Sequence, residues 1–204
     1  LGKCPFVKFE RWLIFGYNKM DSLVNIYAGN PIQNLVYIES LQGVDKIFRI
    51  RSTAGAMLIF KKKGDTQLYL YAMLKEDAKS GVVVPIMQPD DKASDVLYTP
   101  KKLICKQSEK QAYTCAFIDF SQRIGLASLT VNVEEGVLKA AQLKVSKVFE
   151  NQIGSAENTV AYEFADFGDK YALFGNFQKD MDIFTIDGPN SVYWRVKGGE
   201  FINS

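Results

Sequence analysis

Short runs of Val, Ile, Tyr, Phe and Thr recur along the whole chain, and this recurrence most constrains what the chain can fold into. Turn-forming residues, chiefly Gly, Asn, Asp and Pro, separate the runs at short and fairly even intervals. Such spacing is typical of all-β proteins. The expected strands are 11–17, 23–28, 35–41, 44–51, 56–62, 66–74, 82–87, 96–99, 102–106, 111–120, 125–133, 159–167, 170–177, 181–186 and 191–196.

Several of these runs alternate between apolar and polar residues. Val192, Trp194 and Val196 fall on one side of an extended chain, whereas Arg195 and Lys197 fall on the other. A strand with one packed face and one wet face is typical of antiparallel sheets. We therefore expect a single antiparallel β-barrel or β-sandwich of about a dozen strands, with little helix.

Two segments need separate treatment. Pro85 interrupts the run at 82–87, and because proline lacks a backbone N–H, it predicts an edge strand or a bulge there. Residues 137–149 fit a helix through Ala140 and Ala141 but a strand through the β-branched Val145 and Val148. We interpret this segment as a strand.

One β domain is expected over residues 1–204. The chain is 47% apolar and 24% charged, which is enough apolar material to bury a core without help from metals. The polar segment 151–158 is the best candidate for a domain boundary, and its length is typical of a loop.

The chain contains no histidine, which removes several chemistries. Neither a Ser-His-Asp nor a Cys-His nucleophile can form, and no imidazole can serve as a base near neutral pH. The adjacent carboxylates Asp90-Asp91 and Glu134-Glu135 fall in expected turns rather than in a catalytic pair. The three cysteines are too scattered for a zinc site. We therefore expect no enzyme, no catalytic residue and no metal.

Charge and hydropathy also limit the partners. Lys and Arg total 25 against 23 acidic residues, a balance too even for a dedicated nucleic-acid binder. The basic run Lys61–Lys63 precedes Gly64 and is interpreted as a solvated hairpin tip. Apolar runs such as Val82–Ile86 are far shorter than the about 20 residues of a membrane-spanning helix. Neither nucleic acid nor a membrane span is expected.

The cysteines predict a disulfide. If Ser108–Lys110 forms a turn, Cys105 and Cys115 oppose each other across a hairpin, close enough to bond. Cys4 is the alternative partner for either of them, and buried free thiols are the other possibility. A disulfide indicates an oxidising compartment. The chain begins at Leu1 rather than Met, as after removal of a leader, so we expect an extracellular protein.

Aromatic residues give one run two apolar faces. Tyr69 and Tyr71 share one face of the expected strand 66–74, opposite Leu68, Leu70 and Leu74. Such a strand fits between two cores, in a barrel wall that meets a partner copy, or in a wall that lines a ligand cavity. Ordinary core packing explains the pattern as well.

Neighbouring runs carry further aromatic residues that can line the same space, among them Phe15 and Tyr17. Tyrosine hydroxyls suit a cavity because they need hydrogen-bond partners and can orient a ligand. The candidate ligand-binding residues are Tyr27, Tyr37, Phe48, Phe60, Tyr69 and Tyr71.

Two short motifs carry a resemblance to a known family. They are Leu1-Gly2-Lys3-Cys4-Pro5 and Asp166-Phe167-Gly168-Asp169-Lys170-Tyr171-Ala172-Leu173. The first looks like the mature start of the lipocalins of the apolipoprotein-D-like and arthropod type, and the second is similar to the Thr-Asp-Tyr-x-x-Tyr-Ala stretch of that family. The resemblance implies a cup-shaped barrel whose apolar interior holds a small ligand.

The leading functional hypothesis is therefore non-catalytic binding and transport of a small hydrophobic molecule inside a secreted β-barrel. No cofactor is expected beyond a bound pigment or lipid, and a homo-oligomer remains open. The alternative is a structural or recognition module, such as a lectin-, adhesin- or capsid-like β-sandwich, that acts through its surface. A third hypothesis is an enzyme that uses carboxylate, Tyr or Lys chemistry. A void of several hundred cubic ångströms inside the barrel favours the carrier, and a filled core favours the module.

Overall fold

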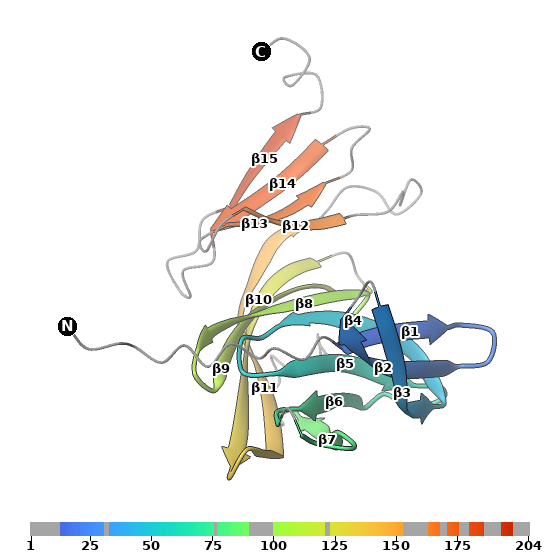
Figure 1. The fold of residues 1–204 in the computed structure, drawn as a ribbon. Coiled ribbons are helices and arrows are strands. Elements are labelled where there is room, and N and C mark those ends of the chain that lie inside the picture. The colour runs from blue at the N-terminus through green and yellow to red at the C-terminus, as the bar shows by residue number, and fades with distance from the viewer. Residues whose placement is uncertain are drawn as a thin grey trace.

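The computed structural model describes residues 13–30, 33–75, 77–89, 100–120, 123–152, 163–167, 171–175, 180–185 and 193–197 (Figure 1). The fold is all-β, as expected, and no helix occurs within these ranges. The strands are β1 Leu13–Asn18, β2 Leu23–Asn30, β3 Gln33–Gln42, β4 Val44–Arg51, β5 Ala56–Lys62, β6 Leu68–Met73, β7 Val82–Met87, β8 Lys102–Glu109, β9 Ala112–Ile118, β10 Arg123–Glu134, β11 Val137–Gln152, β12 Glu163–Phe167, β13 Tyr171–Gly175, β14 Asp180–Thr185 and β15 Tyr193–Lys197.

Eight strands close into a barrel, which decides between the barrel and the sandwich. Its order around the ring is β10-β11-β7-β6-β5-β4-β8-β9. Strands β4–β7 form one antiparallel meander and β8–β11 form another. The two meanders meet at two seams, β4 with β8 and β7 with β11, and both seams are parallel.

The parallel seams were not predicted from the alternating patterns. In an up-and-down barrel, strands that follow one another in sequence are neighbours in the ring. Here β7 and β8 are consecutive in sequence but lie on opposite sides of the ring. The connection between Met87 and Lys102 is much longer than a hairpin turn, so the chain is free to begin its second meander across the barrel.

The two uncertain segments have clear outcomes. Residues 137–149 lie in β11, so the strand interpretation is confirmed. Pro85 does not mark an edge strand, because β7 pairs with β6 on one side and with β11 on the other. The pairing with β11 begins only at Ile86, directly after the proline, and spans just two residue pairs. Pro85, which has no N–H to donate, thus lies directly before the first residue of β7 that pairs with β11.

The barrel interior forms the main core. Every one of the eight strands contributes to it, because alternate residues of each strand point inward. The buried members are Phe48, Met57, Ile59, Leu68, Leu70, Ala72, Val84, Ile86, Leu103, Cys105, Tyr113, Cys115, Phe117, Ala127, Leu129, Val131, Leu138, Ala141 and Leu143.

A second core lies outside the barrel wall. Strands β1, β2 and β3 form a three-stranded antiparallel sheet, and Val24 and Ile26 of β2 pack against Phe60 of β5 and against Tyr71 and Met73 of β6. Strand β6 therefore has an inward face in one core and an outward face in the other. This explains its two apolar faces, for which the sequence left several interpretations open.

The β8–β9 hairpin carries the predicted disulfide. Cys105 and Cys115 are directly opposite in the strand register and are bonded to each other. Both are fully buried in the barrel interior. The alternative partner, Cys4, lies outside the described residues.

The C-terminal strands form a sheet of their own. Strands β12, β13, β14 and β15 pair in sequence order, each antiparallel to the next. The candidate boundary at 151–158 begins inside β11, and residues 153–158 lie outside the described part of the chain, as does the expected strand 96–99.

No helix within the described residues has the length and hydropathy needed to cross a membrane.

Candidate functional site

The barrel interior is the first place to look for a ligand. An eight-stranded barrel is just wide enough either to be filled by its own side chains or to hold one small ligand. Here nineteen buried side chains from all eight strands form one continuous cluster. Large residues such as Tyr113, Phe117 and Leu129 are at most 1% exposed within it. Among the described residues, the protein's own side chains therefore occupy the space that a ligand would need.

The six candidate ligand-binding residues lie in three different places. Phe48 points into the barrel, and Phe60, Tyr69 and Tyr71 point outward, toward the three-stranded sheet. Tyr27 and Tyr37 make an edge-to-face pair with each other on β2 and β3. The structure therefore does not bring the six together around one cavity. A prediction based on shared apolar character could not distinguish the two sides of the barrel wall.

Tyr71 and Glu39 fasten the three-stranded sheet to the barrel. The Tyr71 hydroxyl donates to Oε1 of Glu39 at 2.8 Å, and the backbone N–H of Gly81 donates to the same oxygen at 2.6 Å. Gly81 must be glycine here, since a Cβ at this position would overlap the Tyr71 ring. The Glu39 carboxylate and the Tyr71 hydroxyl thus hold the sheet against the barrel. Nothing in the sequence around either residue indicated that the two would be in contact.

A second polar contact lies at the turn before β6. The Tyr69 hydroxyl donates to Asp65 at 2.7 Å, and the Gln67 backbone N–H donates to the same carboxylate at 2.9 Å. The bond from Gln67, followed by that from Tyr69, holds the pKa of Asp65 below its ordinary value. The bond to Asp65 in turn raises the pKa of Tyr69. Lys62 lies over the Tyr69 ring, 4.6 Å from its centre.

Lysines gather where β4 and β8 begin. The Lys46 ammonium donates to the carbonyl oxygen of Lys101 at 2.5 Å. Partial burial lowers the pKa of Lys46, Asp45 opposes that shift, and the charges of Lys101 and Lys61 add to it. Lys61 itself lies 3.5 Å from Asp45 in an exposed ion pair. A single exposed pair of this kind contributes little to stability.

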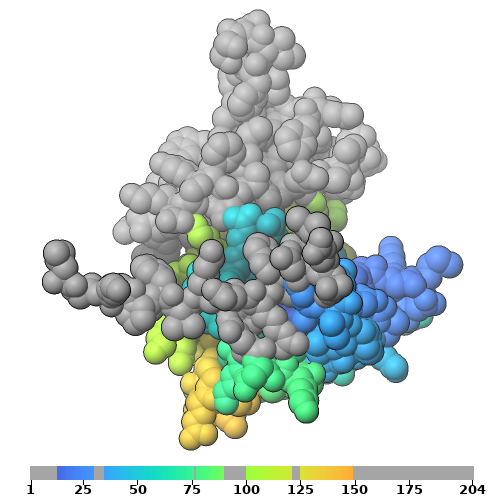
Figure 2. All heavy atoms as spheres, in the orientation of Figure 1, coloured from blue at the N-terminus to red at the C-terminus, as the bar shows by residue number. Residues whose placement is uncertain are grey.

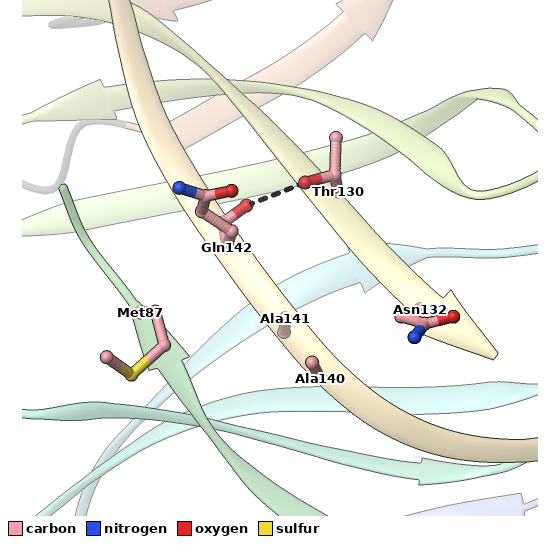
Figure 3. A pocket seen from close by; sticks show the side chains of 6 residues that line it. All are labelled: Met87, Thr130, Asn132, Ala140, Ala141 and Gln142. Atoms are coloured by element: carbon pink, nitrogen blue, oxygen red, sulfur yellow. Dashed lines mark hydrogen bonds between the residues drawn. The ribbon is translucent and has the colours of Figure 1, made fainter.

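A shallow depression lies on the outer wall of β10 and β11 (Figure 3). Its volume is about 370 Å³, and no charged side chain lines it. Thr130 donates a long hydrogen bond of 3.5 Å to the Gln142 carbonyl, so the hydroxyl spans the two strands. The lining residues are Met87, Thr130, Asn132, Ala140, Ala141 and Gln142.

This depression depends on the parallel seam. Thr130 and Asn132 of β10 pair with Gln142 and Ala140 of β11, so all four lie on the outer face. Met87 is opposite Gln142 across the seam and forms the remaining wall. The alternation of 128–132 indicates an outward polar face, but nothing in the sequence places Met87 beside it.

Exposed apolar side chains gather on β3. Leu35, Val36 and Tyr37 are consecutive, and their exposed fractions are 49%, 60% and 55%. Figure 2 shows blue side chains of the three-stranded sheet at the surface, beside green side chains of the segment around β7. The Glu39 carboxylate of β3 accepts from the backbone N–H of Gly81, just before β7. Strand β3 is at one end of its sheet and pairs with β2 alone.

Within the described ranges, no group of three or more Cys, Asp or Glu side chains is close enough to hold a metal ion.

Comparison with known proteins assigns no family to the chain. No family model matches it, and no curated protein sequence matches it. A solved structure with a similar arrangement is the WD40 domain of SCAP from fission yeast, at 10% sequence identity and a TM-score of 0.48. The match covers 92% of this chain and 45% of that one, so the chain spans less than half of the structure that it matches.

Proposed function

We propose that this chain is a non-catalytic recognition module that acts outside the cell through its outer surface. The observation that carries the proposal is the filled barrel interior, in which one cluster of side chains reaches all eight strands. A carrier of hydrophobic molecules needs a preformed cavity of several hundred cubic ångströms, lined mainly by apolar groups. The tyrosines that suggested such a cavity pack outside the barrel instead.

The disulfide supports the extracellular setting. A Cys105–Cys115 bond persists most readily in an oxidising compartment, because cytosolic thiols are kept reduced. The module would therefore be secreted or displayed outside the cytosol.

The depression on β10 and β11 is lined by uncharged residues, which supports recognition of an uncharged group. Its hydroxyl and amide groups from Thr130, Asn132 and Gln142 are hydrogen-bonding groups, and Met87 and Ala140 supply small apolar contacts. A few placed polar groups within apolar surroundings are what fixes the orientation of a bound molecule. This surface suits a neutral polar group of a partner.

The test compares the natural protein with a variant that has an engineered cavity. Leu129→Ala removes a fully buried side chain from the interior, and such cavities bind small apolar molecules such as benzene or xenon. We expect native mass spectrometry of the natural protein to show no bound small molecule, and titration with apolar dyes or xenon to show no binding. The Leu129→Ala variant is the positive control and should bind xenon.

A different result would overturn the proposal that the chain is a recognition module. If the natural protein releases an apolar small molecule on unfolding, or binds the dyes without any substitution, then its interior is open and the carrier function is correct. Ser128→Ala is the matched control, because it shortens an exposed side chain on the same strand, outside the depression, and leaves the interior untouched.

A further inference from the structure

Three lysines lie in a row across neighbouring strands at one end of the barrel. Lys61 of β5 is directly opposite Lys46 of β4 in the strand register. On its other side β4 pairs in parallel with β8, where Arg49 is beside Ile104. The same register, continued three residues back along both strands, places Lys46 beside Lys101. Strands β5, β4 and β8 are adjacent in the barrel wall (Figure 1), and strands lie about 4.8 Å apart, so this lysine row spans roughly 10 Å.

The lysine row lies on the inner rim of the barrel. Side chains alternate along a strand, so Lys46 is on the same face as Phe48, and Lys61 is on the same face as Ile59. Phe48 and Ile59 belong to the cluster inside the barrel. The three lysines come where that cluster ends, and all are partly exposed. A lysine can bury its stem while its ammonium reaches water, and the Lys46 ammonium lies 5.4 Å from the centre of the Phe48 ring.

The ammonium groups of the row have few partners of opposite charge. Lys46 donates to the carbonyl oxygen of Lys101, and Lys61 lies 3.5 Å from Asp45 in an exposed ion pair. The Lys101 ammonium has no hydrogen bond or ion pair with any residue that the structure describes. Asp119, directly after β9, is buried and interacts with residues outside the row. Asp45 therefore offsets at most one of the three charges.

Keeping these cations together costs stability. Like charges that are directly opposite on adjacent strands destabilise a sheet. Partial burial lowers the pKa of Lys46, and Asp45 opposes that shift. The charges of Lys101, Lys61 and Lys102 lower this pKa further. Natural proteins break a local rule of this kind mainly at functional sites, and an anion bound across the row would remove the repulsion.

We propose that the lysine row binds a sulfate or phosphate group. Each ammonium has three donors, and such a group presents several acceptor oxygens, so neighbouring lysines can contact it together. The partial exposure of all three lysines leaves the row open to a ligand from solvent. The site is separate from the neutral depression on β10 and β11, because β4, β5 and β8 are not adjacent to those strands in the ring.

Two neutralising substitutions test the site. Lys46→Gln and Lys101→Gln each remove one charge from the row and keep a polar side chain of moderate length. Lys139→Gln is the matched control, because it makes the same change at an exposed lysine of β11, a strand that is not adjacent to β4, β5 or β8.

Isothermal titration calorimetry at low ionic strength measures binding. The ligands are inorganic phosphate, inorganic sulfate and dextran sulfate, and neutral dextran is the control for the polymer. We expect the natural protein and Lys139→Gln to bind at least one of the anionic ligands with equal affinity and to leave dextran unbound. Lys46→Gln and Lys101→Gln should each weaken that binding at least about threefold. Added NaCl should weaken it as well, because salt screens exposed charges.

The ligands distinguish the source of the group. Binding of phosphate or sulfate ions that weakens in the row variants shows a site for the free ion. Binding of dextran sulfate alone, with the same loss, shows that the group must be carried on a larger molecule. The proposal is overturned if no anionic ligand binds, if both row variants bind as well as the natural protein, or if Lys139→Gln weakens binding equally.

Urea unfolding without oxyanions in the buffer tests the row independently of any ligand. Lys101→Gln should be at least as stable as the natural protein, because it relieves repulsion and breaks no side-chain contact with a described residue. A clear loss of stability would show that this charge is structural and would overturn the proposal. Absence of anion binding leaves the recognition module intact, since that depends on the filled barrel, and dye binding inside the barrel would leave the lysine row intact.

Discussion

Asp65 shows how one turn residue connects charge with fold at the residue scale. Its carboxylate accepts from the Gln67 N–H and from the Tyr69 hydroxyl, and both bonds favour the ionised form. The pKa of Asp65 is therefore lower in the folded protein than in the unfolded chain. Because Asp65 lies at the surface and is only partly buried, the effect is modest, and its pH dependence is more informative than its size.

The sign of that dependence follows from proton linkage. The stabilisation is fully present above the ordinary carboxyl pKa of about 3.9 and is lost as the pH falls through the lowered value. We expect the natural protein to unfold less easily than Asp65→Asn at neutral pH, with the difference shrinking in acid. Urea unfolding at a series of pH values measures it. A difference that grows in acid would contradict the assignment.

Two aromatic residues on β6 show what the sequence pattern of a strand can predict and what it cannot. Tyr69 and Tyr71 share an apolar face in the sequence, and that face was correctly identified. Their hydroxyls have different partners, Asp65 four residues away and Glu39 on another sheet. The first partner is local enough to be inferred from the chain, whereas the second depends on how the sheet packs.

At the element scale, the β8–β9 hairpin owes part of its stability to the disulfide. Cys105 and Cys115 are separated by 10 positions, so the closed loop is short. The loop-entropy relation gives about 2 to 3 kcal/mol for a loop of this size. We expect reduction with a thiol to lower the unfolding free energy by that amount in urea unfolding.

The paired variant Cys105→Ala with Cys115→Ala is the control for the reducing agent. It should match the reduced natural protein within about 1 kcal/mol and should not respond to added thiol. Equal stability of the oxidised and reduced natural protein would show that the bond does not constrain the unfolded chain.

The strands themselves follow closely from local patterns. Strands β4, β5 and β7 coincide with their expected ranges, 44–51, 56–62 and 82–87, because each is bounded by turn residues and has a clear apolar face. Strand β11 was harder, since its alanines favour a helix while its valines favour a strand. Pairing with β10 along nearly its whole length decides the matter, and that pairing is a tertiary contact.

On the scale of the whole molecule, the barrel and the three-stranded sheet have separate cores. No residue of β1, β2 or β3 belongs to the cluster inside the barrel. The sheet is held by the outer core and by the contact of Glu39 with Tyr71 and Gly81. Parts of a protein with separate contacts can open independently.

This separation predicts two different responses to loss of a buried side chain. Ile26→Ala, in the outer core, should speed amide exchange in β1–β3 and leave β9 and β10 nearly unchanged. Leu129→Ala, in the barrel, should destabilise the whole protein by about 2 to 5 kcal/mol and speed exchange throughout. Hydrogen exchange detected by mass spectrometry distinguishes the two. Equal acceleration of β9 and β10 by Ile26→Ala would show that the two cores unfold as one.

The sequence by itself determined the all-β class, most strand positions and the two apolar faces of β6, and it gave Cys105–Cys115 as one of the possible disulfides. Each of these depends on neighbours along the chain: the two-residue period of a strand, the length of a turn, and the residues that a hairpin brings opposite. The tertiary structure alone decided the ring order, the parallel seams and which side of the wall each aromatic residue faces. Those features depend on strands far apart in sequence, such as β4 with β8 and β7 with β11. The sequence led us to expect an open, cup-shaped barrel, whereas side chains of all eight strands pack together inside it. That packing depends on contacts between distant strands, and the proposed function depends on the packing.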